Sequence, residues 1–207
     1  MTVLDLPPPA RTRPRLGGID GNEILTVWTA AVLTLLLVAE GVTVLNVRGL
    51  LRPHMFIGLV LVGPVALKLA STGYRMVRYY TGARPYREKG PPPTALRLLA
   101  PALVVATVAV LVSGIALMAV GHRSDTLLTA HKASFIVWGA LFAAHFLWYA
   151  PRVLRSLRRD WSAAPRHAVP GSGWRAALVA AALGGGVALA LSLLPLISGW
   201  HGRHGPF

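Results

Sequence analysis

The sequence predicts an all-α integral membrane protein built as a bundle of five transmembrane helices. Of its 207 residues, 54% are apolar and only 14% are charged, whereas soluble domains carry about 25% charged residues. Five apolar stretches are long enough for the roughly 20 residues that a helix needs to cross a bilayer. The segments between them are rich in proline, glycine and charge. These observations together predict membrane spans joined by polar connectors.

The predicted spans follow the apolar runs and cover residues 24–45, 54–74, 96–120, 127–149 and 176–198. Arginines precede the first run, as in a signal peptide, but the run is too long for a signal segment and ends in no small-residue cleavage site, so we expect it to be retained. The connectors at 81–95 and 151–173 cannot cross lipid, because their backbone polar groups would be unpaired. Residues 1–22 are expected to form a disordered cytoplasmic tail and 201–207 a short outer tail, with the transmembrane domain at 23–200.

Basic residues are distributed unequally between the two sides of the predicted membrane. With the N-terminus inside, cytoplasmic segments hold fifteen of the lysines and arginines and outer segments hold five. This asymmetry predicts a multi-pass protein of the cell (inner) membrane with a cytoplasmic N-terminus and an outer C-terminus. Because the basic residues lie between apolar runs, the net charge of +14 indicates membrane loops and no nucleic-acid surface. The absence of cysteine excludes disulfides, iron–sulfur clusters and covalently attached haem.

Four ionisable residues stand out within these spans, where charge is costly and is a mark of function. His54 and Lys68 lie on the second span, and His131 and His145 lie on the fourth. Each pair is fourteen residues apart, which places its members on one helix face with a rise of about 21 Å. Both spans run from outside to inside, so we expect His54 level with His131 and Lys68 level with His145. This arrangement suits haem b, which axial imidazoles from facing helices can hold inside a bundle.

The segment HKASFIVWGALFAAH and the matching spacing on the second span resemble the membrane-embedded b-type cytochromes. These include cytochrome b561-like proteins and the diheme cytochrome b subunits of respiratory complexes. The resemblance covers residues 48–150 and implies a four-helix haem-binding core with His54 and His131 as axial ligands of one haem b. It also implies a second, inner site with His145 as the candidate iron ligand. Such a protein would transfer electrons across or within the bilayer, with a redox partner or a quinone.

Lys68 departs from this pattern, since a diheme protein would have histidine at its position. A neutral lysine amine can ligate iron, so Lys68 and His145 could bind a second haem; otherwise they would form a polar pair such as a proton relay. Glu40, on the first span, adds a charge in the outer half of the membrane. We expect it to pair with Arg48, with Arg52 or with a group beside the haem.

Plainer interpretations of the same residues stay open. A histidine side chain near the outer interface costs little free energy, because it can reach water, and Lys68 could extend to the inner headgroups. The protein would then be a membrane scaffold or accessory subunit, or a proton- or ion-conducting protein that uses Glu40, Lys68 and His145. The sequence contains no motif for hydrolysis or group transfer, so we expect any enzymatic role to be that of an electron-transfer component.

Overall fold

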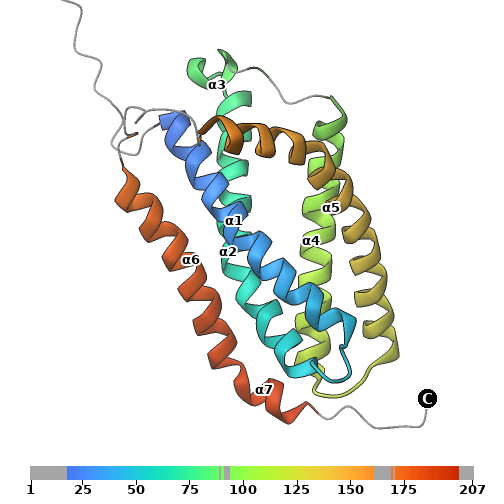
Figure 1. Cartoon of the computed structure of the whole chain (residues 1–207). Helices are drawn as coiled ribbons and strands as arrows, with labels where there is room; N and C mark the ends of the chain where they lie inside the picture. The colour runs from blue at the N-terminus through green and yellow to red at the C-terminus, as the bar shows by residue number, and fades with distance from the viewer. Residues whose placement is uncertain (1–17, 89, 91–93, 161–168, 170, 201–207) are drawn as a thin grey trace, which may run out of the picture.

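A computed structural model describes residues 18–88, 90, 94–160, 169 and 171–200, and every regular element in these residues is a helix (Figure 1). The elements are α1 Gly18–Leu45, α2 Leu51–Tyr80, α3 Arg84–Glu88, α4 Thr94–Val120, α5 Asp125–Asp160, α6 Ser172–Ser192 and α7 Leu194–Gly199. Because α1 begins at Gly18, residues 18–22 are helical, although the sequence placed them in the tail. Residues 1–17 and the expected outer tail at 201–207 lie outside the described residues.

The prediction of five helices long and apolar enough to cross a membrane is confirmed for the described residues. These helices are Gly18–Leu45, Leu51–Tyr80, Thr94–Val120, Asp125–Tyr149 within α5, and Ser172–Ser192. The last one ends at Ser192, six residues before the expected end of the fifth span at Ser198. Pro195 explains this difference, because it has no N–H to donate to the Leu191 carbonyl and its ring would clash with that group. The chain therefore turns at Leu193 and continues as the short helix α7.

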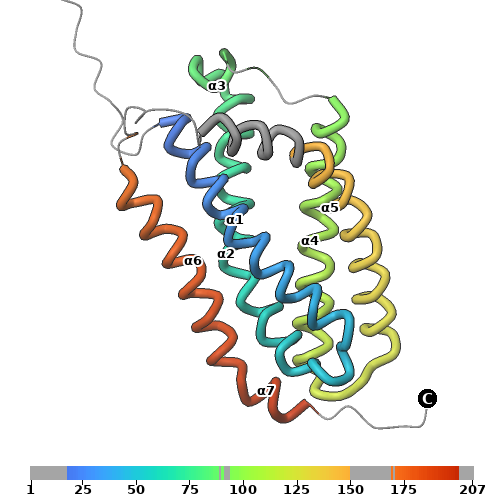
Figure 2. The backbone as a smooth tube through the Cα atoms, viewed as in Figure 1, coloured from blue at the N-terminus to red at the C-terminus, as the bar shows by residue number. Residues whose placement is uncertain are grey.

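The helices form two hairpins that lie side by side, with one further helix outside them. Helices α1 and α2 form the first hairpin and α4 and α5 the second, while α6 lies along the first hairpin, away from the second (Figure 1). The α1–α2 turn, the α4–α5 turn and α7 lie at one end of the molecule, and α3 lies at the other (Figure 2). Helix α2 connects the parts, since it packs on α1, on α6 and, more sparsely, on α4. Helix α5 packs mainly on α4.

Small residues allow α2 and α6 to approach very closely. A Cβ atom added at Gly63 would overlap the carbonyl oxygen of Ala182, and one added at Gly186 would overlap the carbonyl oxygen of Val60. Pro64 contributes to this contact, because it cannot donate the hydrogen bond that the Val60 carbonyl would normally accept within the helix. Close backbone contact between small residues is the usual means by which apolar helices associate in lipid. This contact fixes α2, which carries two of the four predicted site residues.

Candidate functional site

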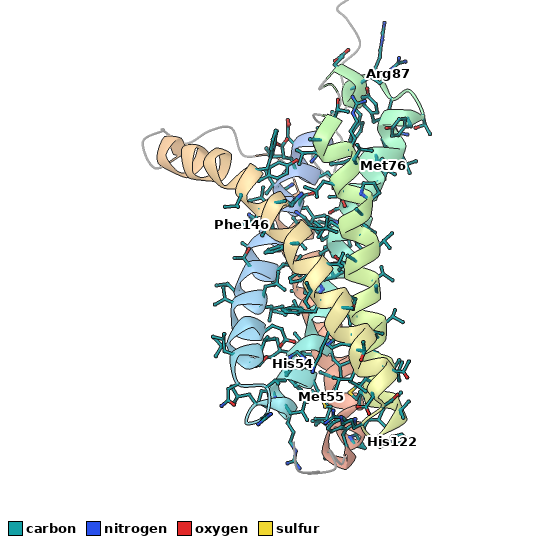
Figure 3. All side chains as sticks on the ribbon, turned by 90° about the vertical axis from the view of Figure 1, so that its right-hand side faces the viewer. His54, Met55, Met76, Arg87, His122 and Phe146 are labelled. Atoms are coloured by element: carbon teal, nitrogen blue, oxygen red, sulfur yellow. The ribbon has the colours of Figure 1, made fainter. Side chains whose placement is uncertain are left out.

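His54 and His131 lie together in the bundle, as the fourteen-residue register predicts. His54 projects from the first turn of α2 and His131 from the second turn of α5. Their ring centres are 6.2 Å apart, and the ring planes are inclined at 68°. Figure 3 shows His54 toward the same end of the molecule as His122, with Arg87 at the opposite end. The two side chains therefore approach each other at the level that the sequence assigns to the outer side.

The Nδ1 atom of His54 is held by α1. It lies 2.9 Å from Oε1 of Glu40 and 3.2 Å from the Thr43 hydroxyl. Because a carboxylate only accepts hydrogen bonds, its position beside Nδ1 favours the neutral tautomer with the hydrogen on Nδ1 and the lone pair on Nε2. Within the described residues, no hydrogen bond reaches that Nε2 atom.

The Nδ1 atom of His131 is held by α4 in a similar way. It lies 3.1 Å from the Val110 carbonyl oxygen and 3.1 Å from the Ser113 hydroxyl. The carbonyl only accepts, so Nδ1 again carries the hydrogen and Nε2 the lone pair. Gly114 provides the room for this ring, because a Cβ atom at that position would lie 3.0 Å from Cε1 of His131. Each histidine is thus oriented through Nδ1 by a neighbouring helix, which leaves Nε2 as the atom for another partner.

This geometry suits a metal ion bound between two imidazoles. Two metal–nitrogen bonds of about 2 Å and the half-widths of two imidazole rings give ring centres about 6 Å apart, and the observed separation is 6.2 Å. Histidines that ligate metals almost always direct the other ring nitrogen at a carboxylate or a backbone carbonyl. Here Nδ1 of His54 lies 2.9 Å from the Glu40 carboxylate, and Nδ1 of His131 lies 3.1 Å from the Val110 carbonyl. The described residues contain no group of three or more His, Cys, Asp or Glu that could hold a bare metal ion.

The inner level is arranged differently. Lys68 donates a 2.9 Å hydrogen bond to the carbonyl oxygen of Thr26 on α1. Beside it, Asn22 donates to the Ser71 carbonyl at 3.1 Å. Across the bundle, the buried Nδ1 of His145 has no hydrogen-bond partner among the residues that the structure describes. The Lys68 amine is directed at a backbone carbonyl of α1.

An aromatic stripe runs along α5 between the two levels. Phe135, Trp138, Phe142 and Phe146 stack in sequence, with ring centres 6.0, 5.0 and 6.0 Å apart. Trp138 and Phe142 follow His131 by seven and eleven residues, so they share its face of the helix. The stripe gives α5 a flat apolar surface beside that histidine.

Sequence reasoning missed the aromatic stripe and most of the residues that hold the histidines. Thr43, Ser113 and Gly114 were not singled out. Glu40 was expected to pair with Arg48, with Arg52 or with a group beside the haem, and the structure places it 2.9 Å from His54. A usable signal was present, since Ser113 and Gly114 adjoin in an apolar part of α4. His201 and His204, in the expected outer tail, lie outside the described residues.

No family model, curated protein or solved structure matches the chain. The function must therefore be argued from the geometry of the two histidines and their neighbours.

Proposed function

We propose that the protein is a membrane-embedded b-type haem protein that transfers single electrons. The observation that carries this proposal is the 6.2 Å separation of the His54 and His131 ring centres, with both Nδ1 atoms engaged and both Nε2 atoms available. His54 and His131 would bind the iron, and the bound haem would supply reversible one-electron chemistry. Glu40 and the Val110 carbonyl hold the two rings in the required tautomer.

The surrounding helices support the same proposal. Helix α5 packs on α4 and makes little contact with α1 or α2, so the two hairpins are not closely packed where the histidines approach each other. The aromatic stripe on α5 offers an apolar wall to a flat macrocycle, and it would keep water from the site. We propose a single haem at the outer level, because Lys68 is already hydrogen-bonded to Thr26.

We also propose that the five long helices cross the membrane with the α3 end in the cytoplasm. The α3 end carries Arg75, Arg78, Arg84, Arg87 and Arg97, whereas the opposite end carries Arg48, Arg52, Arg123 and Lys132. Arg123 is partly neutralised by Asp125, at 2.9 Å. The excess of basic residues at the α3 end agrees with the positive-inside rule, and it places the two histidines toward the outer face.

The proposal is tested by the absorption spectrum of the full chain purified from membranes with haem supplied. We expect a Soret band and the spectrum of a six-coordinate, low-spin haem. His54→Ala and His131→Ala should each remove this spectrum, while His122→Ala, at an exposed position in the α4–α5 turn, should keep it. Circular dichroism would verify that the variants stay helical. A wild-type protein with no Soret band, before and after haem addition, would refute the proposal.

A further inference from the structure

The two candidate iron ligands differ in the charge of the groups that hold them. Nδ1 of His54 lies 2.9 Å from Oε1 of the Glu40 carboxylate. Nδ1 of His131 instead contacts, within the described residues, a backbone carbonyl and a hydroxyl, from Val110 and Ser113. A charged partner interacts more strongly with a ring N–H than a neutral one does. The outer site therefore places a carboxylate oxygen directly against one ligand ring and neutral dipoles directly against the other.

Glu40 is held in place from several directions. Its second oxygen, Oε2, lies 3.1 Å from the hydroxyl of Thr43, a residue only 4% exposed whose hydroxyl also bonds the Glu40 backbone carbonyl at 2.6 Å. The Glu40 side chain itself is only 13% exposed. A Cβ atom at Gly58, one turn beyond His54 on α2, would lie 3.6 Å from Oε1, so α2 presents a glycine to the carboxylate. The Glu40 carboxylate is therefore largely shielded from solvent, with a polar atom beside each of its oxygens.

We propose that Glu40 is a positioning residue that lowers the reduction potential of the haem iron by acting through His54. The proposal rests on the proposed function. A carboxylate oxygen 2.9 Å from Nδ1 favours a hydrogen on that atom and raises the electron density at Nε2, and this makes the imidazole a stronger donor to iron. The stronger donor and the nearby negative charge both stabilise the ferric state relative to the ferrous state. Hydrogen bonds to axial ligands are an established means of setting haem potentials.

The test compares midpoint potentials of haem-loaded, full-length variants in an optical redox titration. Glu40→Gln keeps the shape and an acceptor oxygen but removes the charge, so its midpoint potential should shift upward. Asp125→Asn is the matched control, because it also removes one carboxylate charge, at the first residue of α5 beside the α4–α5 turn, where the side chain is 84% exposed and contacts neither histidine. Its potential should stay near that of the wild type. The electron paramagnetic resonance spectrum of the ferric haem should change in Glu40→Gln and not in Asp125→Asn.

Two outcomes separate the inference from the haem assignment. If the wild type binds haem and Glu40→Gln has an unchanged potential and ferric spectrum, the role of Glu40 is refuted while the haem assignment stands. If the wild type binds no haem, the proposed function itself fails. If Glu40→Gln does not retain haem, the Glu40→Asp variant is measured in its place. Glu40→Asp keeps the charge but moves it away from Nδ1 of His54, so we expect a smaller upward shift of the midpoint potential. An unchanged midpoint potential would refute the inference.

Discussion

The Lys68 ammonium nitrogen lies 2.9 Å from the carbonyl oxygen of Thr26, and this hydrogen bond connects α2 to α1 at the inner level of the bundle. The Thr26 hydroxyl bonds its own helix through the Asn22 carbonyl, at 2.7 Å, and lies 3.4 Å from the hydroxyl of Ser71. Lys68 is thus part of a polar contact between two helices. Its position on the face shared with His54 does not make it an equivalent iron ligand.

Replacement of Lys68 by methionine should leave the haem content unchanged at one per chain. The variant should lower the stability by about 1 kcal/mol, which is typical for a hydrogen bond between membrane helices. Haem per chain can be measured by pyridine haemochrome assay, and stability by thermal unfolding in detergent. Lys132→Met, at an exposed lysine on α5, is the control and should change neither quantity. Two haems in the wild type, with one lost in Lys68→Met, would instead make Lys68 an iron ligand.

The matched depth of the two polar levels could be predicted from sequence because it depends only on spacing along single helices. Fourteen residues return a side chain to nearly the same face whatever surrounds the helix. The partners of the histidines depend instead on how α1 and α4 are rotated about their axes, and linear spacing does not encode that rotation. For this reason Glu40 could be recognised as a buried charge but not as the partner of His54.

The different partners of the polar residues at the inner and outer levels also could not be predicted from the sequence. Lys68 and His145 have the same register as the outer pair, and only the structure places the Lys68 amine against a carbonyl of α1. The end of α6 is a different case. Pro195 was present in the sequence as a known helix breaker, yet the apolar run continues past it to Ser198. Hydropathy alone therefore extended the fifth span beyond Ser192, where the continuous helix α6 ends and the separate short helix α7 follows.

Gly114 should be needed for haem retention because it makes room for the His131 ring. A Cβ atom at this position would lie 3.0 Å from Cε1 of that ring, and the ring is held on its other side by the Val110 carbonyl. Gly114→Ala should therefore move the ring and weaken haem binding about 10-fold or more, the usual effect of disturbing the groups that orient a metal ligand. The rate of haem transfer to apomyoglobin measures this loss.

Gly139→Ala is the matched control for that experiment. Gly139 also lies in the middle of a long helix, α5, but an added Cβ would meet nothing within 4 Å. Its rate of haem transfer should therefore equal that of the wild type. Equal rates in both glycine variants would show that the His131 ring does not depend on close contact with α4.

The proposed orientation predicts opposite accessibilities for the two ends of the bundle. The sequence contains no cysteine, so single cysteines can be introduced without background labelling. Arg87 in α3 and His122 in the α4–α5 turn are exposed and lie at opposite ends (Figure 3). A membrane-impermeant maleimide should label His122→Cys in intact cells and should label Arg87→Cys only after the membrane is opened. The proposed topology keeps the arginine-rich segments in the cytoplasm. The reverse labelling pattern would place the α3 end outside and the haem site at the cytoplasmic face, and it would contradict this topology.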